Sequence, residues 1–251
     1  MSLKPGTNYT VTKHTAVGGV TSVTKDPFSP TQIGRPHISA QTFIVPVADV
    51  SNSDHCIQVN HNLSDGDAVV YWSAGGLHLT KANSSGINVA AMNPQVGEVD
   101  LIANTLHDAN RAHGLKTGDT VVYAHGGGTL ITSSPQLVTN KEYYVIKVDD
   151  NTIKLATTYD NAIAGTAIDL QTTGNNDQVI QDCIQDNETL YISRKTGSET
   201  SEFYLHANKN AALLSGGGGA DKIEFSDVTA LKGNNNQSFS TSFGRLAPTS
   251  D

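Results

Sequence analysis

Short runs of β-branched and aromatic residues alternate with turn-forming residues along much of this chain. Residues 118–123 read GDTVVY, residues 141–147 read KEYYVIK, and residues 152–156 read TIKLA. Val, Ile, Tyr and Thr favour strands, and the Asp-Asp-Asn at 149–151 is typical of a tight hairpin turn of type I′. The pattern therefore predicts an all-β fold in which strands are joined by tight turns.

One phrase of this pattern occurs twice. HNLSDGDAVVYWSAGG at 61–76 and HGLKTGDTVVYAHGGG at 113–128 agree at nine of sixteen positions. Agreement of this extent in a short window indicates an internal duplication. In each copy a Gly-Asp turn leads into a strand, and a double glycine then marks a tight reversal. The shared residues that define this repeat motif are His61, Gly66, Asp67 and Tyr71 in the first copy, and His113, Gly118, Asp119 and Tyr123 in the second.

The two copies continue differently. The second copy runs on directly into its hairpin, whereas residues 77–95 after the first copy match none of that continuation. A matching second half, NETLYISRKTGSETSEFYLHANKNAALLSG, occurs instead at 187–216. We infer that the second unit is inserted in a loop of the first, because lengthening a surface loop costs little entropy. The alternative is two tandem units followed by a divergent third piece.

We therefore expect an all-β protein of two small β-sandwich or barrel-like modules. The expected first module is discontinuous and spans 41–84 and 184–226, and the inserted second module spans 85–183. The remaining segments, an N-terminal arm (1–40) and a C-terminal arm (227–251), are polar and lack a clean period. An arm without its own core is ordered only against something else, commonly a neighbouring subunit.

Charge and composition exclude several classes of protein. The formal net charge of −8 argues against a general binder of nucleic acid or anionic membranes. The chain has no apolar run of membrane-spanning length, and its N-terminus lacks the apolar core of a signal peptide, so neither a membrane span nor Sec-type secretion is expected. Cys56 and Cys183 are too few for a disulfide scaffold and are expected to be small buried residues.

The histidines and acidic turns raise the question of a metal site. His107, His113 and His125 lie close together in sequence, but their spacing fits no zinc signature and no Cys pair accompanies them. The acidic turn at 149–151 lacks the closing Glu of an EF-hand. We expect exposed loop histidines here, whereas His61 and His113 should brace the turn before each strand through side-chain hydrogen bonds.

No local motif indicates catalysis. SGGGGADK at 215–222 does not match a phosphate-binding loop, and no nucleophile elbow is present. The sequence predicts a non-enzyme that needs no cofactor. Trp72 stands where the second copy has Ala124, and we expect an edge or interface aromatic, with sugar stacking as the alternative.

The second unit resembles a known family. HGLKTGDTVVYAHGGG, followed by NKEYYVIKVDDNTIKLATTYDNAIAGTAIDL, is similar to a small β-module common in virion proteins of tailed phages, especially those of cyanobacteria. In that module GDxVxY, a Gly-rich turn, YYVI and NTIKLA recur. The resemblance covers roughly 99–171, parts of 55–76 and 187–216, and neither arm. Large tail proteins and bacterial surface adhesins carry similar modules.

The resemblance implies a structural protein of the virion, made in the host cytoplasm. Two units with two arms look most like a head decoration (cement) protein, with the major capsid protein and neighbouring copies of itself as partners, and thus a homo-oligomer on the particle. The alternative is a tail adaptor, a fibre-associated protein or a receptor- or glycan-binding protein, in which Trp72, Tyr123 and the loops make the contact. The expected interface residues are Phe28, Arg35, Trp72, Phe239, Phe243 and Arg245.

Overall fold

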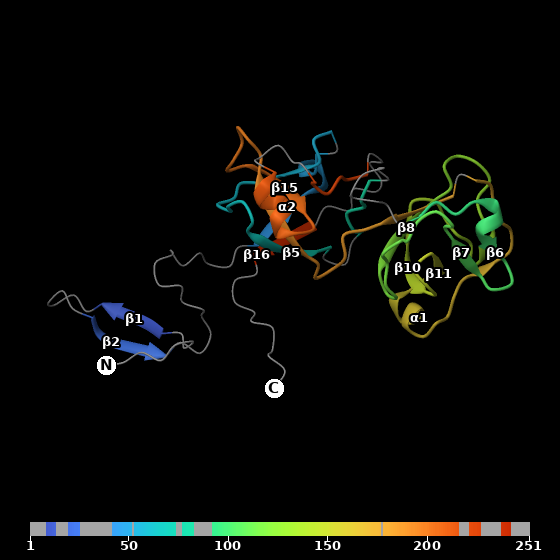
Figure 1. Cartoon of the computed structure of the whole chain (residues 1–251), viewed down its shortest axis with the longest axis horizontal. Helices are drawn as coiled ribbons and strands as arrows, with labels where there is room; N and C mark the ends of the chain where they lie inside the picture. Colours follow the sequence, from blue (N-terminus) through green and yellow to red (C-terminus); the bar gives the residue numbers. More distant parts are fainter. Residues whose placement is uncertain are drawn as a thin grey trace. The chain divides into compact units, whose positions relative to one another are not determined.

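The computed structural model is mostly β, with two short helices (Figure 1). It describes residues 9–13, 20–25, 42–51, 53–73, 77–82, 92–176, 178–215, 221–226 and 237–241. Contacts divide the chain into two units, and each is described by itself: residues 1–41 with 242–251 form one, and residues 42–241 form the other.

The described part of the first unit is a β-hairpin. β1 (Tyr9–Lys13) and β2 (Val20–Lys25) pair antiparallel in a sheet of their own. The register places Val11 opposite Val23 and shifts at Lys13. This hairpin lies in the segment that was predicted to be an extended arm.

The second unit contains two six-stranded sheets, and the first of them defines the first module. Its strand order is β3-β16-β5-β14-β15-β4, and every pairing is antiparallel. The helix α2 follows β15. The bounds are β3 (Thr42–Val45), β4 (Cys56–Gln58), β5 (Ala68–Trp72), β14 (Thr189–Arg194), β15 (Glu202–His206), α2 (Lys209–Leu214) and β16 (Gln237–Thr241), with the 3₁₀ turn η1 (Val47–Asp49) after β3.

The other six-stranded sheet defines the second module, in the order β13-β8-β10-β11-β7-β6. β9 and β12 of this module form a separate two-stranded antiparallel sheet. The bounds are η2 (Val96–Glu98), β6 (Val99–Asp100), β7 (Thr105–His107), β8 (Thr120–Ala124), β9 (Ser133–Ser134), β10 (Lys141–Lys147), β11 (Thr152–Ala156), α1 (Tyr159–Ile163), β12 (Asp169–Leu170) and β13 (Val179–Asp182).

The second module is inserted in the first. β5 and β14 are hydrogen-bonded neighbours in the first sheet, with Thr189 opposite Val70. All strands of the second sheet lie between these two strands in the chain. The tandem arrangement is therefore wrong, because it would place the two halves of the first sheet in separate units.

The duplication extends over whole modules rather than over one motif. In β3 the residue opposite Phe239 is Phe43, and in the second module Met92 bridges Ile180 in the same way. Both Phe43 and Met92 are buried. Val50 bridges Ile57 in the first module just as Val99 pairs with Leu106 in the second. These equivalences were missed because the letters at these positions differ, and only the pairing reveals them.

The correspondence between the first and second modules also continues beyond the double glycine of the repeated phrase, although the sequences match no further there. Lys81 bridges Phe225 in the first module, and Ser133 pairs with Leu170 in the second. Beside these pairs, Ser226 donates its backbone N–H to the Thr80 carbonyl, and Gln171 does the same to Thr132. The first module thus follows the repeat as far as Lys81, and the chain then departs into the inserted module.

The C-terminal boundary requires a correction. Residues 237–241 were predicted to belong to an arm, yet they form β16, which lies between β3 and β5 in the first sheet. The burial of Phe239 explains this position, because its side chain is fully enclosed in the core of the first module. Pairing on both sides of β16 supplies the partners that a short polar segment lacks locally.

The hairpin of β10 and β11 forms as predicted, but its turn is of another kind. A type I′ turn needs positive φ at its central residues. Asp149, Asp150 and Asn151 are not among the residues with positive φ. Instead, Val148 and Asp149 both donate backbone N–H groups to the Thr152 carbonyl, and Asn151 donates to the Asp149 carboxylate. The acidic residues at 149 and 150 therefore belong to a loop in which the Asp149 carboxylate accepts a backbone N–H.

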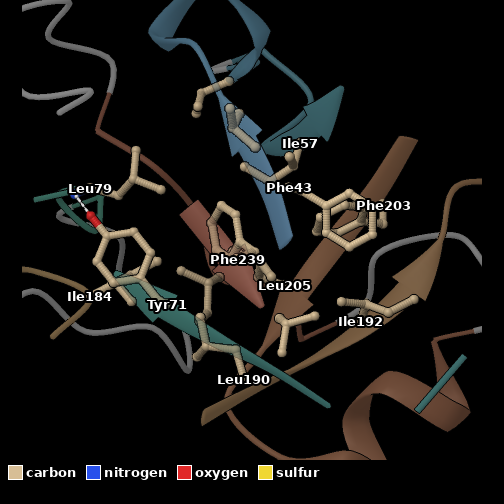
Figure 2. Close-up of a cluster of buried hydrophobic side chains, with 14 of the residues drawn as sticks. Phe43, Ile57, Tyr71, Leu79, Ile184, Leu190, Ile192, Phe203, Leu205 and Phe239 are labelled. Carbon is tan, nitrogen blue, oxygen red and sulfur yellow. Dashed lines mark hydrogen bonds between the residues drawn. The ribbon is translucent and has the colours of Figure 1, made fainter. Parts of the chain in front are cut away.

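Each module has its own core. Figure 2 shows the first core, in which Phe43, Tyr71 and Phe239 gather from neighbouring strands with Leu190, Ile192 and Phe203 from the second half of the chain. The second core gathers Met92, Tyr123, Tyr143 and Ile153, together with aliphatic residues of the other strands. Each core is built mainly from the alternate, inward-facing residues of its sheet.

Candidate functional site

The repeated histidine braces the turn that precedes each strand. In the second module the backbone N–H of Leu115 donates to His113 Nδ1 at 2.9 Å, and His113 Nε2 lies 2.9 Å from the Asp149 carbonyl oxygen. In the first module Leu63 donates to His61 Nδ1 at 3.2 Å. Both histidines are buried. Their geometry is that of structural residues, which is the role expected for them from the sequence.

The Gly-Asp pair forms a tight turn in both modules. Gly66 has φ +81° and Gly118 has φ +95°, a region that side chains rarely adopt. The Asp67 carboxylate accepts the backbone N–H of Ser64 at 2.8 Å, and the Asp119 carboxylate accepts that of Lys116 at 2.7 Å. Burial, partly offset by that backbone hydrogen bond, raises the pKa of Asp119. These contacts again hold the backbone rather than present a site.

The repeated tyrosine belongs to a hydrogen-bonded group that we call the Tyr–Gln latch. In the first module the Tyr71 hydroxyl donates to Gln237 Oε1 and accepts the backbone N–H of Leu79 at 2.9 Å (Figure 2). Gln237 Nε2 donates to the Leu77 carbonyl at 2.8 Å. The latch thus ties β5, the segment after it and β16 together inside the protein.

The second module contains the same latch. The Tyr123 hydroxyl donates to Gln178 Oε1 and accepts the backbone N–H of Ile131 at 3.0 Å. Gln178 Nε2 donates to the Thr129 carbonyl at 2.9 Å. Burial raises the pKa of both Tyr71 and Tyr123, so their hydroxyls stay protonated donors. Tyr123 is fully buried, so this side chain does not make the glycan or tail contact that was considered for it.

Sequence reasoning identified the tyrosines and missed the glutamines of the latch. A usable signal was present, since Gln178 and Gln237 each stand two positions before a large buried residue, Ile180 and Phe239. That spacing carries no meaning until the last strands of the two modules are known to be equivalent. All eight residues of the repeat motif therefore serve the architecture of the module.

The structure places the predicted interface residues in different surroundings. Trp72 is 45% exposed and Ile44 is 66% exposed. The register places both opposite Ser238, so the three lie in a row across β3, β16 and β5 on one sheet face. Phe239 is not an interface residue, because it lies in the core. The other predicted interface residues, Phe28, Arg35, Phe243 and Arg245, lie outside the described residues.

The second module has a hollow on the equivalent face. It encloses about 290 Å³ and is lined by Asn93, Gln95, Gly126, Asn176, Gln178 and Val179. Asn93 and Val179 stand where the first module has Ile44 and Ser238, and Ala124 stands in place of Trp72. At these positions the first module thus carries two large exposed apolar side chains, Ile44 and Trp72, where the second has Asn93 and Ala124.

The junction between the modules is polar. Lys81 Nζ lies 2.7 Å from Asp182 Oδ2 and 3.8 Å from Glu188 Oε1. Burial of Lys81 opposes its charge, but the two carboxylates outweigh this effect and raise the pKa of Lys81. Gln185 accepts the backbone N–H of Thr120 and donates to the Thr120 carbonyl. These bonds fasten the returning chain of the first module to β8 of the second.

The metal question has a limited answer. Within the residues that the structure describes, no group of three His, Cys, Asp or Glu side chains could hold an ion. His107 Nδ1 lies 2.9 Å from the Thr152 hydroxyl, and His113 is engaged with the backbone as described.

Cys56 and Cys183 are buried free thiols, as expected. Neither of the two described helices has the length or apolarity to cross a membrane.

Comparison with known proteins adds no relative. No protein-family model, no curated protein and no solved structure matches this chain.

Proposed function

We propose that this chain is a structural protein of a tailed-phage virion, and specifically a decoration protein that binds and stabilises the head shell. The proposal rests on the resemblance of the repeat unit to phage virion modules and on the role of the motif residues. Those residues all hold the backbone, so the module is a scaffold, and its outer surface is where a partner is bound.

The observation that carries the proposal is the N-terminal hairpin. β1 and β2 pair only with each other among the described strands, and they belong to a different unit from the modules. A two-stranded sheet by itself is marginally stable in water. Each of its edges can accept another strand. A capsid subunit or a neighbouring copy supplies the surface that such a hairpin needs.

The mechanism is mechanical. The N-terminal segment and the outer faces of the modules bridge neighbouring capsid subunits and bury surface that the undecorated shell exposes. A standard protein interface removes roughly 1,600 Å² from water. Because a capsid repeats the same site by symmetry, modest contacts made by linked elements add up through effective concentration.

Deleting residues 1–40 tests the proposal. The truncated chain should keep the folded modules, since β3 begins at Thr42. It should fail to bind undecorated heads in a sedimentation assay, whereas the full chain binds. The matched control is Tyr191→Phe, a conservative change at a half-buried residue of β14 that leaves the hairpin and Trp72 intact, and it should bind heads as the full chain does. Normal head binding by the 1–40 deletion would overturn the proposal.

A second candidate is a tail or receptor-binding protein that contacts glycans. The row of Ile44, Ser238 and Trp72 favours it, because an exposed indole beside hydroxyl groups suits a sugar face. Copy number separates the two candidates, since decoration requires hundreds of copies per particle and a tail position about a dozen or fewer. Loss of glycan or cell binding in Trp72→Ala, with head binding unaffected, would support the second candidate.

A further inference from the structure

His78 lies where the two modules meet, and its imidazole faces a carboxylate on each side. Nδ1 lies 3.2 Å from Glu142 Oε1, and Nε2 lies 3.5 Å from Asp186 Oδ1. Glu142 belongs to β10 of the second module, whereas Asp186 belongs to the segment that returns to the first module. The side chain of His78 is 9% exposed. We propose that His78 is a pH-sensitive clasp that fastens the inserted module to its host module.

Backbone groups hold both carboxylates in place. The backbone N–H of His78 donates to Glu142 Oε1 at 2.5 Å, and that of Ser73 donates to Asp186 Oδ1 at 2.7 Å. The two acceptors therefore stay at the ring whatever its protonation state. A change in charge on the imidazole acts directly on the contact between the modules.

The number of N–H donors on the ring decides the strength of the clasp. A protonated imidazole donates from both nitrogens and can bind both carboxylates with charge-assisted bonds. A neutral imidazole has one N–H, so its other nitrogen presents a lone pair to a carboxylate. Because the site is shielded from water, the difference in interaction energy between the charged and the neutral imidazole is larger than it would be at the surface. Protonation of His78 therefore tightens the junction, and deprotonation loosens it.

Neighbouring titratable groups do not replace His78 in this role. The Tyr71 ring lies 6.3 Å from the His78 ring, and burial raises the pKa of Tyr71 and of Tyr144, with Glu142 and Asp186 adding to both shifts. Burial also raises the pKa of the Cys183 thiol. These three groups stay neutral around neutral pH.

The state of Lys81 further isolates the clasp. The remaining cation at the junction, Lys81, is already held by its two carboxylates, and the raised pKa of Lys81 keeps it charged.

The duplication supplies an internal comparison for the clasp. The position of His78 in the second module is occupied by Leu130, that of Asp186 by Thr139, and Glu142 corresponds to Thr189 of the first module. None of the three equivalents is ionisable. The module fold therefore does not require these groups, and they occur together only where one module joins the other.

The experiment measures the distance between the modules as the pH changes. Spin labels are placed on Leu214→Cys in α2 and Ile102→Cys after β6, since these side chains are 85% and 97% exposed. The native cysteines are buried and should not react. Between about pH 5.5 and about pH 8, the range in which histidines titrate, the intermodule distance distribution should broaden as the pH rises.

Three variants complete the test. His78→Gln should lose the pH dependence, because a glutamine amide stays neutral. Glu142→Gln should lose it as well, since it removes one carboxylate and keeps the side-chain shape. His125→Gln, in the turn after β8, should keep it. A distribution that does not change with pH in the unmodified sequence, or a His78→Gln chain that responds like it, would overturn the proposal.

Discussion

The two modules share one fold but differ in how the chain completes it. The second module closes within a single stretch, from Met92 to Asp182, whereas the strands of the first run from Thr42 to Thr241. Their cores, turns and latches nevertheless correspond. The comparison shows that the fold is specified by which strands pair, and that a loop at Lys81 can hold an entire second module without altering that pairing. What the interruption adds is a polar junction that neither module needs by itself.

The largest effect should come from removing the last strand of the interrupted module. Deleting 237–251 removes β16 and with it the partner of both β3 and β5, so the first module should unfold while the second survives. Deleting 242–251 should leave both folded. Differential scanning calorimetry of the two truncations distinguishes the outcomes. Equal unfolding profiles for both would contradict the position of β16 in the sheet.

The latch should contribute similarly to both modules. Tyr71→Phe or Tyr123→Phe removes the hydroxyl that bonds the glutamine and that accepts the buried backbone N–H of Leu79 or Ile131, so each should lower the free energy of unfolding by about 1–3 kcal/mol. Tyr191→Phe, at a half-buried residue of β14, serves as the control. Denaturant unfolding measures the change. In the pair Tyr123→Phe with Gln178→Leu the two losses should not add, and strict additivity would contradict the latch.

The glycine turns should show a smaller effect. Gly66→Ala forces a side chain into positive φ, at about 1–2 kcal/mol, and its Cβ would lie 2.8 Å from Leu213 Cδ2, the end of a side chain that can move aside. Gly118→Ala would meet Tyr159 at the same distance. Gly197→Ala has a similar φ but open space, so it isolates the backbone contribution. Thermal unfolding of the three variants compares them, and a Gly197→Ala chain less stable than Gly66→Ala would contradict this ranking.

The smallest expected difference is a response to acid that is specific to the first module. His206 is fully buried there, with Nε2 2.8 Å from the Ser193 hydroxyl, and it stands where the second module has Ala156. Burial lowers the pKa of His206 and of His61. As the pH falls, the unfolded chain therefore takes up protons before the folded chain does. The stability gained by keeping these two histidines neutral in the folded chain is complete above about pH 6.5. It is lost as the pH falls through their lowered pKa values.

Unfolding at a series of pH values measures this response. His206→Ala should reduce the acid sensitivity of the first module, because it introduces the residue that the second module already carries. The buried cavity also lowers stability at every pH, so the slope with pH is the informative quantity. A slope unchanged by His206→Ala would show that this histidine is not the source.

Local patterns were sufficient for much of the fold. The Gly-Asp turn followed by Val-Val-Tyr and the hairpin of β10 and β11 each depend on residues within a few positions of one another. The inserted order followed from the matching second half at 187–216, because a duplicated pattern keeps the order of its parts even when another segment interrupts it. The structural role of His61 and His113 could also be anticipated, since each bonds a backbone N–H two residues away.

The sequence by itself determined that this protein is built of β-strands, that its unit is duplicated, and that one copy interrupts the other. The tertiary structure alone decided the place of β16, the glutamines of the latch and the carboxylates around His78. The physical reason is distance along the chain. Gln237 meets Tyr71 and Glu142 meets His78 only after the sheets have formed, and a short polar segment gives no local sign of the partner that will bury it.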